Sequence, residues 1–433
     1  MRCPPNSLKN QVVEYYFCPH NLIMRTLITS IRQLVLTEEN ARTTPLRGAE
    51  LAILPVLENA FLLIENQRIV DFGDMTHCPL RADQTIDATG RYVLPAWCDS
   101  HTHLVFARSR EEEWVNRLKG MSYEEIANRG GGILNSANRL QETSEDLLFE
   151  QALERLGEVR KSGTGLIEIK SGYGLSVESE LKMLRVIRRL KESSDVEIKS
   201  SFLGAHSVPM TYRNGNRQGY ISLIINEMLP RIADEGLADY VDVFCEKLAF
   251  SVEEMEEVLT AAAQYGLRPK VHVNQFNCMG GIAAAIRHGA VSVDHLEVLD
   301  DSDIEALRNG NTIATLLPSA PFFLQDHIPP ARRLLAANVP VALASDFNPG
   351  TSPSGRMPFV VSLACIMMKM LPEEAIQAAT LNGAFALEVA ADFGSISRGK
   401  YANLIITKPM PSLAYLPYSF GSDLVDMVLI KGK

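Results

Sequence analysis

Two histidines one residue apart, His101 and His103, follow an apolar run at residues 92–98 that is typical of a buried β-strand. Residues i and i+2 of a strand face the same side, so both imidazoles point the same way. Two neutral imidazoles at the end of a buried strand suit a divalent transition metal. The pattern is also compatible with two polar residues that are satisfied at a strand end. Segments further along the chain distinguish these interpretations.

Composition narrows the class of protein. A chain of 433 residues, 46% of them hydrophobic, is long enough for one large domain or for a large and a small one. The net charge of −10 argues against nucleic acid or an anionic membrane as a partner, because both need concentrated Lys and Arg. Seven cysteines without a CxxC pair indicate reduced thiols and a cytoplasmic protein. The longest apolar stretch, residues 358–371, is too short to cross a bilayer.

The two ends of the chain share one kind of sequence. Residues 24–90 and 392–433 hold short apolar strands with turn signals, including a hairpin about residues 65–67. Neither segment has enough strands for a stable sheet alone, so we expect them to pair into a small β-sandwich domain. Residues 1–23 show no clear period and no secretory signal pattern. We expect them to be a disordered arm or translated upstream sequence, with Met24 as the natural start.

Residues 91–391 alternate between strands and helices. Besides the strand before His101, seven apolar segments are predicted strands, at 166–169, 198–203, 240–244, 269–273, 290–293, 312–316 and 340–344. Eight strands alternating with helices predict a TIM-type (β/α)8 barrel of the α/β class. The alternative is an open doubly wound sheet, but no GxGxxG follows a first strand. The glycines at 130–132 follow a predicted helix at 122–129, so they indicate a helix stop or a mobile loop.

Three of the predicted helices carry specific signals. Residues 143–163 end at a glycine and place one apolar face on Leu147, Ala152, Leu153, Leu156 and Val159. Ser251 with Glu254, and Ser302 with Glu305, have the spacing of a capping box. These signals support the alternation of helices with strands.

Histidines gather at the predicted strand ends, which is where the chemistry of a (β/α)8 barrel takes place. Five of the nine histidines are found there: His101, His103, His206, His272 and His295. A single histidine is more often a core residue with satisfied hydrogen bonds. Five histidines on one rim therefore favour a metal site.

The order of these residues resembles the amidohydrolase superfamily, with HxH after strand one, His on strands five and six, and Asp after strand eight. The resemblance implies that four residues hold the metal: His101, His103, His272 and Asp346. Three imidazoles and one carboxylate leave a position for water, whose pKa the metal lowers to about 7. The resemblance also implies that Asp346 passes the proton of this water to the leaving nitrogen. His295 would stabilise charge on the attacked carbonyl.

We expect one divalent metal per subunit, either Zn²⁺ or Fe²⁺. Lys170 ends strand two rather than strand four, so the bridging carbamylated lysine of two-metal relatives is not indicated. Gln275 stands where relatives carry Glu or Gln, and a glutamine cannot act as a base, so it can only position water or substrate. Asn274 is neutral where an aspartate is common, which changes the charge next to His272.

Seven motifs in order narrow the resemblance. They lie at residues 101–110, 122–127, 130–133, 170–175, 202–206, 242–246 and 346–352. Together they resemble the imidazolonepropionase family, from about Met24 to the end of the chain. This resemblance implies hydrolysis of the ring amide of 4-imidazolone-5-propanoate to N-formimidoyl-L-glutamate, in histidine degradation.

The resemblance also implies which residues bind this substrate. Arg110 would make a bidentate pair with the propionate carboxylate, although most arginines in such a charged stretch are solvated. Tyr123 and Tyr173 would donate hydrogen bonds and cover the ring, or else pack under loops. His206 would bond the substrate carbonyl or ring. Contacts to the product carboxylate would come from a segment that is otherwise an ordinary turn, through Asn348, Gly350 and Thr351.

Other functions remain compatible with the sequence. The nearest is another cyclic-amide hydrolase or a deaminase of the same fold, but deaminases usually have an acid after the strand-five histidine, where this chain has Gln275. A barrel that serves only as a binding scaffold is disfavoured, because such proteins lose metal ligands. Since dimers are common among oligomers, a homodimer acting on a small molecule is expected.

Overall fold

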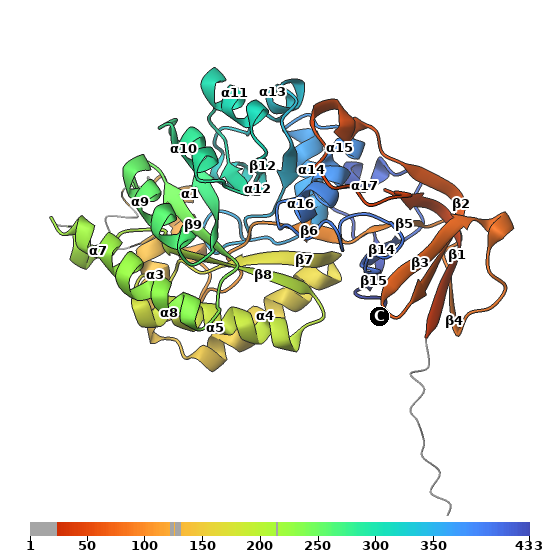
Figure 1. Ribbon diagram of the computed structural model, residues 1–433, viewed down its shortest axis with the longest axis horizontal. Coiled ribbons are helices and arrows are strands. Elements are labelled where there is room, and N and C mark those ends of the chain that lie inside the picture. The colour runs from red at the N-terminus through yellow and green to blue at the C-terminus, as the bar shows by residue number, and fades with distance from the viewer. Residues whose placement is uncertain (1–23, 122–124, 126–130, 214) are drawn as a thin grey trace, which may run out of the picture.

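The computed structural model describes residues 24–121, 125, 131–213 and 215–433. The predictions for residues 1–23 and, apart from Glu125, for the helix at 122–129, which includes Tyr123, fall outside these residues. Eight parallel strands form one sheet in chain order, and helices surround it (Figure 1). The strands are β6 (Trp97–Asp99), β7 (Thr164–Lys170), β8 (Glu197–Ala205), β9 (Tyr240–Cys245), β10 (Arg268–Val273), β11 (Ser292–His295), β12 (Ile313–Leu316) and β13 (Val341–Leu343). The predicted (β/α)8 barrel is confirmed.

The first and last strands of this sheet meet just beyond their ends and nearly close the barrel. A parallel bridge joins Thr102 to Phe347. The Asp346 amide donates to the His101 carbonyl at 3.0 Å, and the His103 amide donates to the Phe347 carbonyl at 2.9 Å. This closure brings the HxH pair and Asp346 side by side although they lie far apart in the sequence.

Alternation along the strands decides which side chains face the barrel interior. In β7, Ile167 and Ile169 pack in the core that the barrel shares with its helices. Glu168 and Lys170 therefore face the opposite side, which is the interior, and both are fully buried. The same alternation in β10 turns His272 inward. The strand sequences thus combine apolar outer faces with a polar interior.

The helices lie between and beside these strands. The α-helices are α1 (Glu111–Leu118), α3 (Ile133–Glu142), α4 (Glu145–Lys161), α5 (Val177–Ser193), α6 (Met210–Arg213), α7 (Arg217–Leu223), α8 (Leu229–Asp234), α9 (Val252–Ala263), α10 (Gly281–Arg287), α11 (Asp301–Asn309), α12 (Ser319–Leu324), α13 (Ala331–Ala336), α14 (Met357–Ile366), α15 (Pro372–Ala378), α16 (Leu381–Phe385) and α17 (Tyr415–Tyr418). A π-helical segment, Ile224–Met228, connects α7 to α8, and short 3₁₀ helices occur at Gly48–Ala52 and Met75–His77.

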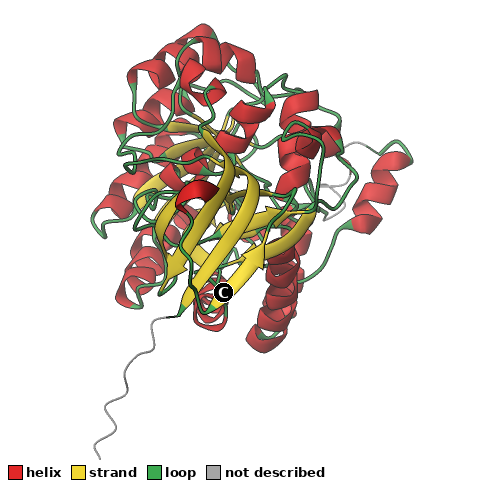
Figure 2. Cartoon of the chain, turned by 90° about the vertical axis from the view of Figure 1, so that its right-hand side faces the viewer, coloured by secondary structure: helices red, strands yellow, loops and turns green. Residues whose placement is uncertain are grey.

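Both ends of the chain join in a second, mixed sheet of seven strands. They are β1 (Arg25–Val35), β2 (Val56–Glu65), β3 (Arg68–Asp74), β4 (Gln84–Asp87), β5 (Tyr92–Pro95), β14 (Leu404–Thr407) and β15 (Val425–Leu429). Strand β14 pairs antiparallel with β5, while β1 has β2 on one side and both β4 and β5 on the other. Figure 2 shows these strands toward the viewer, near the C-terminus. The predicted pairing of the two segments is confirmed, and the domain boundaries stay a prediction.

The predicted hairpin turn and one of the two predicted capping boxes are confirmed. The hairpin between β2 and β3 turns at Asn66 and Gln67, both with positive φ, as a tight two-residue turn requires. The Ser251 hydroxyl accepts from the Glu254 amide at 3.2 Å, so this predicted capping box is confirmed. The predicted box at residues 302–305 is wrong: α11 begins two residues earlier, where Asp300 accepts from the Asp303 amide at 2.8 Å.

The apolar face predicted for the helix at 143–163 needs correction. Helix α4 buries Leu148, Ala152, Leu156 and Val159. Leu147 and Leu153 are 46% and 37% exposed. Spacings of four and three residues continue one stripe from Leu148, whereas Leu147 and Leu153 lie on its flanks.

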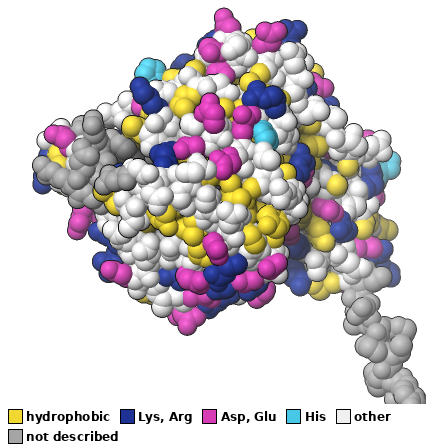
Figure 3. Space-filling view, turned by 60° about the vertical axis from the view of Figure 1, so that its left-hand side comes forward, with side chains coloured by type: hydrophobic (Ala, Val, Ile, Leu, Met, Phe, Trp, Pro, Cys, Tyr) yellow, Lys and Arg dark blue, Asp and Glu magenta, His cyan; other side chains and the backbone are white. Residues whose placement is uncertain are grey.

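Charge is mixed on the surface of the molecule. On the face shown in Figure 3, acidic and basic side chains are interspersed rather than separated by sign. Within the described residues, no helix is both long and apolar enough to span a bilayer.

Candidate active site and metal centre

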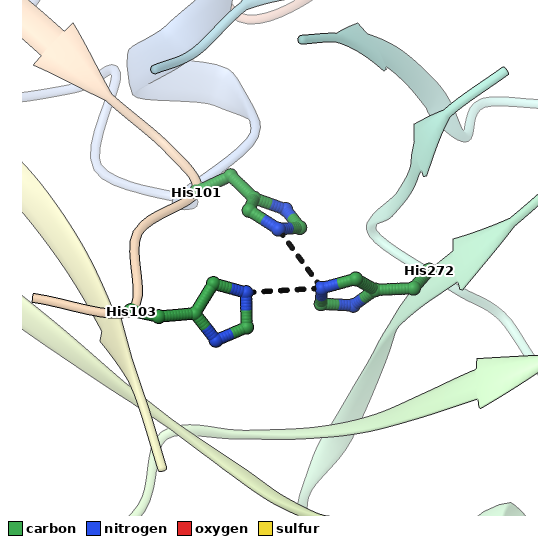
Figure 4. Close-up of side chains that lie close together, drawn as sticks. All are labelled: His101, His103 and His272. Carbon is green, nitrogen blue, oxygen red and sulfur yellow. Dashed lines mark hydrogen bonds between the residues drawn. The ribbon is translucent and has the colours of Figure 1, made fainter. Parts of the chain in front are cut away.

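Three histidine nitrogens converge at the carboxyl end of the barrel (Figure 4). The Nε2 atoms of His101 and His272 lie 3.0 Å apart, and those of His103 and His272 lie 3.2 Å apart. All three side chains are buried. Two nitrogens bound at 2.0–2.1 Å to one tetrahedral zinc lie about 3.3 Å apart. The observed spacing is therefore close to that of ligands around one ion.

The neighbours of these histidines determine which ring nitrogen carries the proton. His101 Nδ1 lies 2.6 Å from Asp294 Oδ2, and His272 Nδ1 lies 2.9 Å from Asp242 Oδ2. Because a carboxylate only accepts, each Nδ1 donates and each Nε2 presents a lone pair. Burial lowers the pKa of His101, His103 and His272 well below 6.5, which keeps the imidazoles neutral. Lone pairs that face one another at 3.0 Å repel, so this donor set fits a divalent cation.

Asp346 completes the cluster from the last strand. Its Oδ1 lies 3.7 Å from His101 Nε2 and 3.6 Å from His103 Nε2. Burial raises the pKa of Asp346 to about 7, and a nearby cation acts in the opposite direction. The residue has a φ of +53°, which is uncommon for an aspartate. Its neighbour Ser345 is fixed by Asp99, which accepts from the Ser345 amide at 2.9 Å and its hydroxyl at 2.6 Å.

His295 lies beside this cluster and carries a different charge. Its Nδ1 is 3.1 Å from Glu297 Oε1. Burial lowers the pKa of His295, but the charge and hydrogen bond of Glu297 outweigh it and raise the pKa to about 9. His295 has a φ of +90°, a strained conformation for a residue with a side chain. The imidazolium is thus placed where a developing negative charge can be stabilised.

The cluster forms the floor of a cavity of about 410 Å³. Ten of the predicted site residues line it: His103, Arg110, Tyr173, His206, His272, Gln275, His295, Asp346, Asn348 and Thr351. His101 lies behind this lining and is fully buried. Tyr123 is outside the described residues. The cavity has room for a ligand the size of a small heterocycle with a short side chain.

Arg110 is fixed at the rim by an ion pair. Its Nε and Nη2 donate to Glu113 Oε2 at 2.9 and 2.7 Å. Glu113 also accepts from the Gly132 amide at 3.1 Å and from Asn135 Nδ2 at 2.9 Å, which connects α1 to α3. A Cβ atom on Gly350 would lie 2.2 Å from Arg110 Nη1, so the guanidinium occupies the space that this glycine leaves.

The other predicted contacts have defined hydrogen bonds. His206 Nδ1 lies 3.0 Å from the Gly172 carbonyl, so Nδ1 carries the proton and Nε2 is an acceptor. Burial lowers the pKa of His206 to about 4, which keeps it neutral. Asn348 Oδ1 accepts from the amides of Gly350 and Thr351, both at 2.8 Å. These two amides are therefore engaged, and the side chains of Asn348 and Thr351 face the cavity.

Several residues of the site were not assigned a role from the sequence. Asp242 and Asp294 orient the metal-facing histidines, and Glu113 orients Arg110. The rim also has an apolar part, formed by Phe244, Leu248, Phe276 and Leu324. The aspartates carry a readable signal, since each interrupts an apolar strand at an inward-facing position. Glu113 has no such signal, because it lies among three consecutive glutamates.

Comparisons with known proteins agree with this geometry. Residues 92–433 match the amidohydrolase family. The imidazolonepropionase of Christiangramia forsetii is 55% identical over 411 residues, which cover 95% of this chain and 100% of that protein. The imidazolonepropionase of Geobacillus kaustophilus is 40% identical over 416 residues, covering 95% of this chain and 98% of that protein.

Solved structures with this fold include two deaminases. Guanine deaminase of E. coli has a TM-score of 0.72 at 14% identity, covering 95% of this chain and 98% of that one. Adenosine deaminase of Xanthomonas campestris, with bound zinc, has a TM-score of 0.66 at 17% identity, covering 95% of this chain and 92% of that one. At such identities the likeness concerns the fold alone.

Proposed function

This chain belongs to the amidohydrolase family and is related to imidazolonepropionases over nearly its whole length, and from this premise we propose its reaction. It hydrolyses the ring amide of 4-imidazolone-5-propanoate to N-formimidoyl-L-glutamate, a step of histidine degradation. One observation carries the proposal. Three histidine Nε2 atoms converge beside Asp346 on the floor of a cavity whose rim presents Arg110.

The floor of the cavity provides the groups for hydrolysis. A bound divalent metal supplies activation of water by lowering its pKa to about 7. Asp346 takes the proton of the attacking water and passes it to the leaving ring nitrogen. His295, with its raised pKa, is charged at neutral pH and stabilises negative charge on the carbonyl oxygen. Gln275 lines the cavity and positions water or substrate, because an amide cannot accept the proton.

The wall and rim of the cavity bind the substrate. Arg110, which Glu113 holds in place, pairs with the propionate carboxylate. His206 Nε2 accepts from a ring N–H, since its Nδ1 already donates to a carbonyl. Tyr173 packs beside His206, with ring centroids 5.4 Å apart, and covers the imidazolone ring. The product carboxylate contacts the Asn348 and Thr351 side chains, while Gly350 leaves room for the guanidinium.

We also propose the metal, the oligomeric state and the cellular location of the enzyme. The metal is a single Zn²⁺ or Fe²⁺ ion held by His101, His103, His272 and Asp346, because three imidazoles and one carboxylate suit either. The chain acts as a cytoplasmic homodimer. Its five cysteines within the described residues are free thiols, as is usual in a reducing compartment. Analytical ultracentrifugation tests the homodimer, and cell fractionation tests the cytoplasmic location.

Substrate turnover tests the proposed reaction directly. Purified protein is mixed with freshly generated imidazolone propionate, the ring absorbance is followed, and the product is identified by mass spectrometry. We expect rapid loss of absorbance, formation of formimidoylglutamate, and an arrest by chelation that added Zn²⁺ or Fe²⁺ reverses. Intact substrate after incubation with metal-loaded protein would overturn the proposal and favour another cyclic amide.

A further inference from the structure

The barrel interior behind the histidines contains a cluster of five charged side chains, and three of them, Glu168, Lys170 and Lys270, have no part in the proposed reaction. It consists of Glu168, Lys170, Asp242, Lys270 and Asp294, and all five are fully buried. They come from β7 and from the three adjacent strands β9, β10 and β11, with β8 between β7 and β9, at inward-facing positions of the period-two pattern. Burying a charged side chain is costly unless an opposite charge lies beside it. The partners of each charge therefore indicate the role of the cluster.

Lys170 is at the centre of this cluster. Its Nζ lies 2.7 Å from Glu168 Oε1, 2.8 Å from Asp242 Oδ2 and 3.8 Å from Asp294 Oδ2. The Asp242 Oδ2 atom is also the one that faces His272 Nδ1 at 2.9 Å, and Asp294 Oδ2 faces His101 Nδ1 at 2.6 Å. One ammonium therefore contacts the same two oxygens that orient two of the three converging imidazoles.

We propose that Lys170 is a positioning residue for the metal centre, fixing the two carboxylates that orient His101 and His272 and thereby setting the affinity of the site for its divalent ion. This inference deepens the proposed function and rests on its metal-dependent part. Burial lowers the pKa of Lys170, but the three surrounding carboxylates raise it above its ordinary value, so the ammonium keeps its charge.

Loss of this ammonium has a predictable consequence for the ion. Removing a positive charge would by itself favour a cation, but it also leaves Asp242 Oδ2 without its contact at 2.8 Å and Asp294 Oδ2 without its contact at 3.8 Å, so both carboxylates can turn. A carboxylate that has turned no longer fixes the Nδ1 proton of its histidine, so the Nε2 lone pair loses its orientation. The net expected effect is weaker metal binding.

Lys270 is the matched control, because it is an equally buried lysine in the same cluster. Its Nζ donates to Ser292 Oγ at 2.8 Å and lies 3.4 Å from Glu168 Oε2 and 4.0 Å from Asp294 Oδ2, but its ion pairs within the described residues do not include Asp242. Lys270→Met removes the same charge and a similar volume. If the cluster were only structural, the two lysine variants would behave alike.

Zinc affinity measured by competition with a chromophoric chelator tests the proposal on the full chain. We expect Lys170→Met to weaken zinc binding about 10- to 100-fold and Lys270→Met to change it less than about threefold. Lys170→Gln, which keeps an N–H donor, is expected to lie between Lys170→Met and the unaltered chain. It also provides a second measurement if Lys170→Met does not fold. The visible spectrum of the Co²⁺-loaded protein should shift for Lys170→Met only, because the spectrum reports ligand geometry.

Two results would overturn the inference. One is zinc binding by Lys170→Met within about threefold of the unaltered chain, or, if that variant does not fold, zinc binding by Lys170→Gln equal to that of the unaltered chain; the other is equal weakening in the Lys270 variant. Failure of the unaltered chain to take up zinc or ferrous iron would instead overturn the metal-dependent function itself, and this inference with it.

Discussion

The floor and the rim of the cavity are held in place by different kinds of structure. On the floor, fully buried carboxylates from the barrel strands orient the histidines. At the rim, Arg110 precedes helix α1, none of whose residues is buried, and depends on Glu113 for its position. The reacting groups are thus fixed by the strands, whereas substrate selection relies on the loops that follow them. Changes to the two regions should therefore alter different measured quantities.

The largest effect is expected at the floor, from Asp346→Asn. The amide cannot carry the proton from water to the leaving nitrogen, so kcat should fall by about 10²- to 10⁴-fold at saturating metal and substrate. Asp326→Asn is the control, because Asp326 lines the same cavity but pairs with the exposed His327. A variant at Asp346 that keeps more than about a tenth of kcat would contradict the role of the carboxylate.

Arg110→Met tests the rim. Loss of a charge-assisted hydrogen-bonded pair costs about 1.5–3 kcal/mol, which corresponds to a fall in kcat/KM of about 10- to 150-fold. Zinc affinity should stay unchanged, because Arg110 forms its ion pair with Glu113 at the rim. Arg108→Met is the control at an exposed position two residues earlier. Parallel loss of zinc binding in the Arg110 variant would break the distinction between rim and floor.

Asp242→Asn tests whether a change at the floor alters metal binding and leaves substrate binding intact. An asparagine can donate toward His272 Nδ1 and so favour the wrong tautomer, and zinc affinity should fall about 10- to 100-fold. Once the variant is fully loaded, KM for the substrate should change by less than about twofold, because the rim is intact. Chelator competition and steady-state kinetics on one preparation measure both quantities. A rise in KM without weaker zinc binding would contradict the assignment of metal binding to the floor and substrate binding to the rim.

The smallest effect is expected from Gly350→Ala. The new Cβ would lie 2.2 Å from Arg110 Nη1, the far end of a flexible side chain, so the guanidinium should move with little loss of stability. A displacement of about 1 Å can cost up to about a hundredfold in rate, and we expect a rise in KM of roughly tenfold. In an Arg110→Met background the same substitution should have no further effect. Additive effects would show that Gly350 acts independently of Arg110.

The sequence predicted the barrel well and the rim less well, for physical reasons. Strand ends carry recognisable pairs such as His101 with His103, because the two-residue period places both on one face. The inward position of Asp242 and Asp294 follows from the same two-residue period once the inward face of each strand is known. By contrast, Glu113 is one of three consecutive glutamates, and only the tertiary contact with Gly132 and Asn135 distinguishes it. The first residue of α11 was misplaced because Asp300 and Ser302 both have capping side chains.

A metal titration in which enzyme activity is measured at each step tests the central claim, a single-metal centre, most directly. The protein is freed of metal by a chelator, increasing amounts of Zn²⁺ or Fe²⁺ are added, and hydrolysis of imidazolone propionate is measured at each step. We predict that the metal-free protein has no activity and that activity rises linearly to a break at about one ion per chain. Hydrolysis by the metal-free protein, or a break at about two ions per chain, would contradict the single-metal centre built from His101, His103, His272 and Asp346.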